Sequence, residues 1–111
     1  AGVHQFCRVG RGAMIGGLSA VVADVIPMGM VIGERANLDG LNLIGLKRAG
    51  VNKDHINGLR SAFKSIFQSD GTVKDAIEPT LKIHKGNPLV EEMISFITSE
   101  TSRSLTIPSK D

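Results

Sequence analysis

The residues of this chain that could perform chemistry are few, and their spacing limits what they can do. His55 and His84 have no cysteine or carboxylate set at metal-ligand spacing, so we expect ordinary surface histidines and no metal site. The single cysteine, Cys7, could act as a nucleophile only as a thiolate. It is followed at six-residue steps by Ala13 and Ser19, and this register of small residues favours a packing role.

A stripe of cations offers a second kind of chemistry, the recognition of an acidic partner. Lys53, Arg60 and Lys64, the cationic stripe, recur at helical spacing opposite an apolar face. Such a stripe is most often a solvated surface, and that interpretation stays open beside docking of an acidic protein by complementary charge. The formal net charge of +2 and the aromatic content of 4% argue against a nucleic-acid-binding protein.

The composition is that of an ordinary soluble protein. The 111 residues suit one domain, or a small domain with part of another, and 41% of them are hydrophobic. One cysteine permits no intrachain disulfide, which favours a reducing compartment. No apolar run approaches the roughly 18 residues of a membrane span, and the start does not resemble a signal peptide. We therefore expect a cytoplasmic protein.

The elements that must position these residues begin with a six-residue period. The aliphatic register is Val3, Val9, Ile15 and Val21, and the small register is Cys7, Ala13, Ser19 and Val25. A period of six fits neither a helix nor a simple strand, but it is the repeat of a hexapeptide parallel β-helix. In that architecture the aliphatic register points inward, and the small register lies where the wall bends. An irregular loop with chance periodicity is the alternative.

Hexapeptide repeats bury their inner face only when several turns stack. Residues 1–26 hold only about four hexads, so the pattern predicts a cut through a longer β-helix, and hence a fragment. Pro27 ends the repeat. The apolar run M-G-M-V-I at residues 28–32 predicts one more strand, followed by a turn at residues 33–35.

Beyond this turn the period becomes helical. A short helix is predicted over residues 38–49. Asn52, Thr72 and Asn87 predict the starts of three more helices, because their side chains can accept hydrogen bonds from first-turn backbone N–H groups. The tail from about residue 104 is polar and is expected to fray.

Four segments occur together in this chain: H-Q-F-C, I-G-G-L-S, G-E-R-A and L-N-L-I-G-L-K-R-A-G. The first and last are specific, whereas isolated hexads fit many acyl- and acetyltransferases. Their combination resembles the C-terminal part of the UDP-N-acetylglucosamine O-acyltransferases of lipid A biosynthesis, across residues 1 to about 70. The resemblance implies a homotrimeric enzyme that moves a 3-hydroxyacyl group from acyl carrier protein to the glucosamine 3-hydroxyl of UDP-N-acetylglucosamine. No cofactor is expected.

The fold class that follows from the residues and the resemblance is mixed. Residues 1–37 are predicted to be the C-terminal end of a left-handed parallel β-helix. Residues 38–111 are predicted to form an all-α C-terminal domain. The handedness comes from the resemblance, because the six-residue period alone does not fix it.

The resemblance also implies which residues bind the nucleotide sugar. These are His4, Gln5, Asn42 and Arg48. An arginine can bridge phosphate oxygens with two charge-assisted hydrogen bonds, and an asparagine can pair with hydroxyl or amide groups. The simpler interpretations stay open: satisfied wall residues at positions 4 and 5, and a helix surface pair at positions 42 and 48.

Acyl-chain and carrier-protein contacts are implied in the same way. Met14 and Gly17 match positions near the far end of the acyl groove, where a bulky side chain at position 17 would shorten the groove. Gly17 can equally be a turn glycine. For the cationic stripe, the resemblance implies docking of the acidic acyl carrier protein.

Three departures from the family pattern affect the predicted chemistry. The family's general-base histidine lies in an I-N-A-H-I-A-H-D-type motif, which this sequence lacks, so no residue of the chain is predicted to be catalytic. Ala49 stands where the family has a second arginine, and Ile44 where it often has an acidic residue. Two other functions therefore stay open: a non-catalytic trimerisation or interaction module, and a hexapeptide acyltransferase of another specificity.

Overall fold

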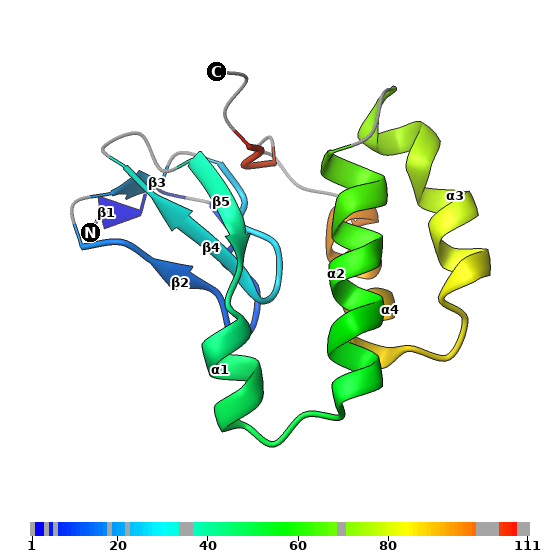
Figure 1. Cartoon of the computed structure of the whole chain (residues 1–111). Coiled ribbons are helices and arrows are strands. Elements are labelled where there is room, and N and C mark those ends of the chain that lie inside the picture. Colours follow the sequence, from blue (N-terminus) through cyan, green and yellow to red (C-terminus); the bar gives the residue numbers. More distant parts are fainter. Residues whose placement is uncertain are drawn as a thin grey trace.

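In the computed structural model of the chain, short strands precede four helices among the residues described below, with the strands on one side and α2, α3 and α4 on the other (Figure 1). The structure describes residues 2–3, 5, 7–17, 19–21, 23–33, 37–68, 71–99 and 105–108. His4 lies outside these residues, so its predicted substrate contact is not described. No helix among them is long and apolar enough to cross a membrane.

The first strands pair in parallel with strands further along the chain, and one turn of the chain from a strand to its stacked partner is called a coil here. They are β1 (Gly2–Val3), β2 (Met14–Ile15), β3 (Ala20–Val21) and β4 (Gly29–Ile32). In the β1–β3 pair Val3 lies opposite Val21, and in the β2–β4 pair Ile15 lies opposite Val31. In both pairs aliphatic residues stack on aliphatic residues from successive coils. The 18 positions between Val3 and Val21 are the three hexads that the six-residue period predicts, whereas Ile15 and Val31 are 16 positions apart, two fewer than three hexads.

Burial of the aliphatic register is uneven. Val21 is 1% exposed, whereas Val3 and Val9 are 50% and 42% exposed. Among the described residues, the register that was predicted to point inward is therefore buried in the second coil and about half exposed in the first. The physical reason is coverage, because the second coil belongs to the same hydrophobic cluster as the helices.

A fifth strand replaces the start of the predicted helix over residues 38–49. Strand β5 (Asn37–Leu41) pairs antiparallel with β4, with Leu38 opposite Val31 and Leu41 opposite Gly29. Helix α1 is correspondingly short (Leu43–Arg48). Leu38 and Leu41 are spaced as on a helix, but pairing with β4 and the bond from the Leu38 N–H to the Ile107 carbonyl keep the backbone extended, and both side chains are buried. Residues 38–111 are therefore not all helical, contrary to the prediction.

The three longer helices begin where their caps predict. They are α2 (Lys53–Phe67), α3 (Val73–Ile83) and α4 (Pro88–Thr98). Asn52 Oδ1 accepts from the Asp54 N–H at 2.8 Å, Thr72 Oγ1 accepts from the Asp75 N–H at 3.1 Å, and Asn87 Oδ1 accepts from the Leu89 N–H at 3.1 Å. Each bond satisfies a first-turn donor that the helix itself leaves unpaired.

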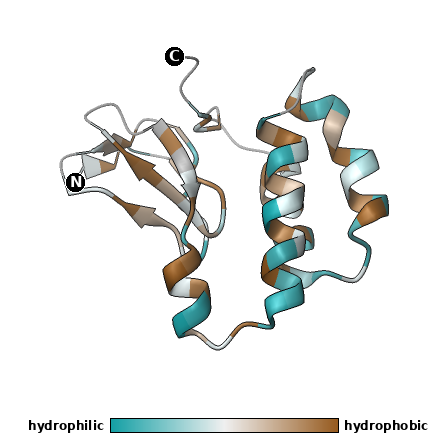
Figure 2. Cartoon of the chain, in the orientation of Figure 1, coloured by the Kyte–Doolittle hydropathy of each residue, from teal (hydrophilic) through white to brown (hydrophobic). Residues whose placement is uncertain are grey.

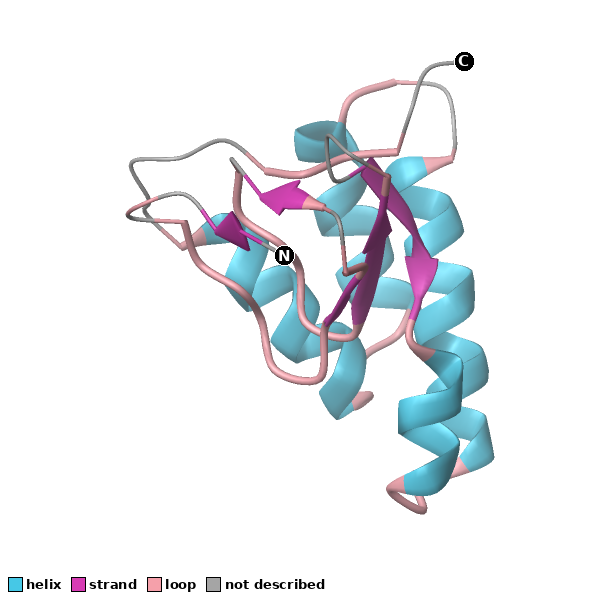
Figure 3. Cartoon of the chain, turned by 90° about the vertical axis from the view of Figure 1, so that its left-hand side faces the viewer, coloured by secondary structure: helices cyan, strands magenta, loops and turns pink. Residues whose placement is uncertain are grey.

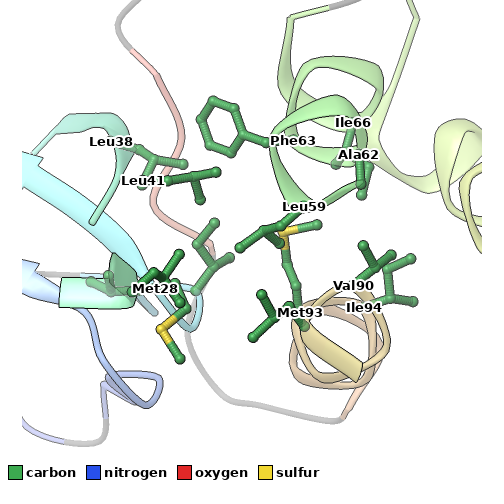
Figure 4. Packing of buried hydrophobic residues seen from close by; sticks show 14 of the residues in the cluster. Met28, Leu38, Leu41, Leu59, Ala62, Phe63, Ile66, Val90, Met93 and Ile94 are labelled. Carbon is green, nitrogen blue, oxygen red and sulfur yellow. The ribbon is translucent and has the colours of Figure 1, made fainter. Parts of the chain in front are cut away.

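One hydrophobic core joins the strands to the helices. Helix α2 is amphipathic (Figure 2) and packs against α3 and α4, and the turned view shows the helices behind the strands (Figure 3). Side chains from three elements meet in the close view (Figure 4): Leu38 and Leu41 from β5, Leu59, Ala62, Phe63 and Ile66 from α2, and Val90, Met93 and Ile94 from α4. Burial of each large aliphatic side chain stabilises the fold by about 1.5–3 kcal/mol.

The C-terminal tail is ordered where it returns to the strands. Leu105 bridges to Asp24 in parallel, and the Ile107 carbonyl accepts from the Leu38 N–H at 3.0 Å. Thr106 is 7% exposed. The prediction that the tail frays from about residue 104 is therefore wrong for residues 105–107, because strand-type hydrogen bonds hold them.

Candidate functional site

Three segments meet at the start of α1: residues 10–13, residues 26–29 and Asn42. The Asn42 side chain donates from Nδ2 to the Gly12 carbonyl at 2.9 Å and accepts at Oδ1 from the Gly45 N–H at 3.1 Å. The Asn42 backbone N–H donates to the Met28 carbonyl at 2.6 Å. Asn42 therefore caps α1 and fastens it to both other segments.

The turn at residues 26–29 explains how the Met28 backbone can bond both to Arg11 and to Asn42. Pro27 pre-sets the first central position of the turn, and Met28 has a left-handed backbone with φ 62°, as the second central position of a type II turn requires. The Gly29 N–H closes the turn on the Ile26 carbonyl at 3.1 Å. The Met28 N–H then donates to the Arg11 carbonyl at 2.8 Å while its own carbonyl accepts from Asn42.

Two glycines make this junction possible. A Cβ at Gly12 would lie 2.3 Å from the Met28 sulfur, and Gly12 has φ +72°, a conformation that side chains disfavour. A Cβ at Gly45 would lie 2.6 Å from Asn42 Nδ2. Neither position can carry a side chain unless its neighbour moves.

The structure distributes the remaining predicted substrate residues around this junction. Met14 lies on β2 opposite Met30, which in turn lies opposite Gly40 on β5, two residues before Asn42. Met14 is 47% exposed. Arg48 is exposed in the last turn of α1, where a cation suits the helix dipole.

Gln5 and Gly17 are exposed on the coil. A Cβ built on Gly17 meets no atom within 4 Å, so a side chain there would extend into open space. Met14 thus lies in the small sheet whose last strand, β5, leads directly into Asn42.

The cationic stripe borders a groove between α1 and α2. This groove has a volume of about 410 Å³, and its lining residues are Leu43, Lys47, Val51, Lys53, Ile56, Asn57 and Arg60. A second hollow of about 310 Å³ continues along α2 over Asn57, Arg60, Ser61 and Lys64. The groove thus has an apolar floor and a cationic rim. Lys47 joins this rim, which sequence reasoning missed because the position of α1 depends on the Asn42 junction.

Sequence reasoning also missed a buried ion pair. Arg8 Nε donates to Asp24 Oδ2 at 2.9 Å, and the Arg8 backbone N–H donates to Asp24 Oδ1 at 2.8 Å. The guanidinium lies 4.3 Å from the centre of the Phe96 ring on α4 and donates to Ser99 Oγ. A lone carboxylate within the apolar run V-V-A-D-V-I was the available signal, because a buried charge needs a partner.

A second arginine of the same loop also reaches α4. Arg11 Nη2 lies 2.6 Å from Glu92 Oε1, one helical turn before Phe96. The hydrogen bond to Glu92 raises the pKa of Arg11, burial opposes that shift, and charge attraction adds to it. Arg8 and Arg11 together hold the coil against α4. These contacts are structural and include no group arranged for acid–base or nucleophilic chemistry.

The parallel strands pair residues that lie 18 and 16 positions apart, and they lead into helices. This arrangement defines the chain as a hexapeptide-repeat protein with a helical extension. The family profile described as Udp N-acetylglucosamine O-acyltransferase, domain 2, matches residues 24–106. The chain belongs to the UDP-N-acetylglucosamine O-acyltransferase family.

Relatives and solved structures agree with this assignment. The chain is 45% identical over 108 residues to the acyl-acyl-carrier-protein–UDP-N-acetylglucosamine O-acyltransferase of Paracoccus denitrificans and 40% identical to that of Rhizobium rhizogenes. These matches cover 97% of the chain and 40% of each relative. The structure is similar to the UDP-N-acetylglucosamine acyltransferase of Arabidopsis, with TM-score 0.86 and 37% identity over 94% of the chain and 39% of the other. For the UDP-N-acetylglucosamine acyltransferase of Francisella novicida the TM-score is 0.87, with 28% identity over 99% of this chain and 40% of the other.

Proposed function

We propose that this chain works as the C-terminal part of an acyltransferase that moves a 3-hydroxyacyl chain from acyl carrier protein to the 3-hydroxyl of UDP-N-acetylglucosamine, the first step of lipid A biosynthesis. The observation that carries this proposal is the match of residues 24–106 to the family, together with the parallel stacking of the strands. The chain spans 40% of the length of its relatives, so the whole reaction needs more than these residues.

The proposed enzyme is a cytoplasmic homotrimer whose coil is the end of a left-handed β-helix. Val3 and Val9 support further protein contacts on the coil, because both apolar side chains are about half exposed. This assembly is expected to place the acyl groove and nucleotide contacts between neighbouring subunits.

The proposed reaction is an acyl transfer with a single base. The sugar hydroxyl oxygen attacks the thioester carbonyl carbon and the base takes the hydroxyl proton. The new C–O bond replaces the C–S bond, and the departing carrier sulfur receives that proton from the base and leaves as a thiol. We propose that the base comes from the remaining part of the enzyme. No cofactor or metal is part of the proposal.

The chain's own contribution is proposed to be binding. His4, Gln5, Asn42 and Arg48 contact the nucleotide sugar, with Arg48 free of ion pairs among the described residues and so open to a diphosphate. Met14 and Gly17 line the end of the acyl groove, which the open space at Gly17 supports.

The cationic stripe is proposed to dock the acidic carrier protein. Its support is the groove between α1 and α2, where Lys53 and Arg60 rim an apolar floor that includes Ile56. A partner helix with acidic residues around an apolar face would match both parts of this groove. An interaction module without catalysis is not favoured, because the relatives are named as transferases over the matched region.

A chimaera tests the proposal in cells. The matching 40% of the Paracoccus denitrificans relative is replaced by residues 1–111 and expressed in a strain whose own transferase is repressed. We expect growth to be restored, because the chain is 45% identical to the segment that it replaces. A chimaera that is present and trimeric but leaves the strain unable to grow would contradict the proposal.

A further inference from the structure

A single amide side chain joins the two segments to which the proposed function assigns different substrates. Asn42 Nδ2 donates to the carbonyl of Gly12, two residues before the acyl-groove residue Met14. Asn42 Oδ1 accepts from the N–H of Gly45, in the helix that ends at the nucleotide residue Arg48. The nitrogen and the oxygen of one amide side chain thus hold the segment before Met14 and helix α1 together.

The backbone around this amide leaves it little freedom. The Met28 N–H donates to the Arg11 carbonyl at 2.8 Å, and the Met28 carbonyl accepts from the Asn42 N–H at 2.6 Å. Met28 therefore links the segment before Met14 to the start of α1. Met28 does so with a left-handed backbone at φ 62°, which costs a non-glycine residue free energy and persists only where neighbours fix it.

Strand β2 is short, so the contacts that flank it matter. Met14 and Ile15 pair with Met30 and Val31 of β4, and the Gly16 N–H donates to the Val31 carbonyl at 2.9 Å. A two-residue ladder holds a segment weakly by itself. The chain immediately before Met14 is anchored by two bonds, the one from the Asn42 side chain to the Gly12 carbonyl and the one from the Met28 N–H to the Arg11 carbonyl. The first of these is the side-chain anchor, which a substitution can remove.

Gly45 decides where the Asn42 amide can lie. A Cβ at position 45 would come within 2.6 Å of Nδ2 and 3.0 Å of Cγ of Asn42. The Asn42 side chain would have to move, and its bond to Gly12 would be lost or displaced. Gly45 therefore controls the Gly12–Asn42 bond without lining the acyl groove.

We propose that Asn42, held in place by Gly45, is a positioning residue that sets the Met14 segment relative to α1 and so tunes the length of acyl chain that the groove accepts. This inference rests on the proposed function. It predicts that a methyl group at position 45 changes acyl-chain selectivity, although Gly45 is not among the residues proposed to line the acyl groove.

The test uses the trimeric chimaera with Gly45→Ala and a series of acyl carrier protein thioesters of increasing chain length. The readout is the ratio of kcat/KM for the preferred donor to that for its neighbours in length, so that changes in stability or carrier affinity cancel. We expect this ratio to change about tenfold, since one methylene in a fitted apolar pocket is worth roughly 10–200-fold. Asn42→Asp keeps the Oδ1 acceptor but sets an oxygen against the Gly12 carbonyl, and it should shift the ratio as well.

Gly58→Ala is the matched control. A Cβ at Gly58 would lie 2.3 Å from Nδ2 of Asn87, the cap of α4, so it disturbs a similar glycine–asparagine pair in the helical part. We expect it to leave the ratio unchanged. The inference is overturned if Asn42→Asp folds and turns over with an unaltered ratio, or if Gly58→Ala alters the ratio as much as Gly45→Ala. If Gly45→Ala does not fold, Asn42→Asp alone decides. Failure of the unsubstituted chimaera to transfer any acyl group would instead contradict the proposed function.

Discussion

Arg8 and Asp24 form an ion pair at 2.9 Å in which the carboxylate is fully buried. Their contacts extend to three parts of the molecule: the coil that carries both residues, the Phe96 ring of α4, and the tail, where the Thr106 N–H donates to the Asp24 carbonyl at 2.7 Å. The pair therefore ties the last coil to the helices and to the C-terminal tail.

Asp24→Asn should destabilise the chain strongly. It removes the charge that compensates the Arg8 guanidinium, and breaking a buried pair from one side costs about 3–5 kcal/mol. We expect a loss of about 3 kcal/mol, at the low end, because the Arg8 side chain is 31% exposed. Urea unfolding of residues 1–111 measures the change in the free energy of unfolding.

Glu92→Gln supplies the comparison on the same face of α4. The Arg11–Glu92 pair is 64% and 34% exposed, and such pairs contribute about 0–1 kcal/mol. We expect a small loss that added salt reduces further. Equal losses for the two variants would show that Asp24 is not the anchor that its contacts indicate.

Arg48→Ala in the chimaera should weaken UDP-N-acetylglucosamine binding more than Arg60→Ala. A lost charge-assisted hydrogen bond is worth about 1.5–3 kcal/mol, which corresponds to roughly tenfold to hundredfold in Kd, and Ala49 offers no neighbouring arginine in compensation. Arg60 lies on the cationic stripe, so its removal should affect the carrier-protein step. Calorimetry with the nucleotide sugar and no carrier protein separates the two, and unchanged binding in Arg48→Ala would remove this residue from the site.

Gly17→Met should shift the chimaera towards shorter acyl donors while leaving nucleotide-sugar affinity nearly unchanged. Nothing lies within 4 Å of the position where its Cβ would stand, so the fold can accept the new side chain, which would occupy the proposed end of the acyl groove. Competition between thioesters of different length measures the shift. An identical length profile in wild type and variant would leave Gly17 as a turn residue.

Local chemistry made the helix starts predictable from the sequence. Asn52, Thr72 and Asn87 each satisfy donors two or three residues ahead, so no distant residue has to be known. The six-residue period likewise predicted the stacking of Val3 on Val21, which lie three hexads apart. Strand β5 could not be predicted, because Leu38 and Leu41 fit a helical period and only the partner strand β4 decides between the two.

The candidate site was predictable as a set of residues but not as a junction. Asn42 was identified by resemblance, yet its bond to Gly12, 30 positions earlier, depends on the left-handed turn at Met28. The chemistry of an asparagine allows a cap or a ligand contact, and the sequence does not reveal which segment its second polar atom meets. Lys47 was missed for the same reason, since its place on the groove rim follows from where α1 is fastened.

The most direct measurement of the central claim is product formation by the purified chimaera with 3-hydroxyacyl-acyl carrier protein and UDP-N-acetylglucosamine. Mass spectrometry should show the nucleotide sugar acylated at its 3-hydroxyl, at a rate far above that of residues 1–111 alone, which lack the family's histidine motif. Acetyl-coenzyme A in place of the carrier thioester should give no product. A folded, trimeric chimaera that forms no acylated nucleotide sugar, or that uses the acetyl donor instead, would contradict the account.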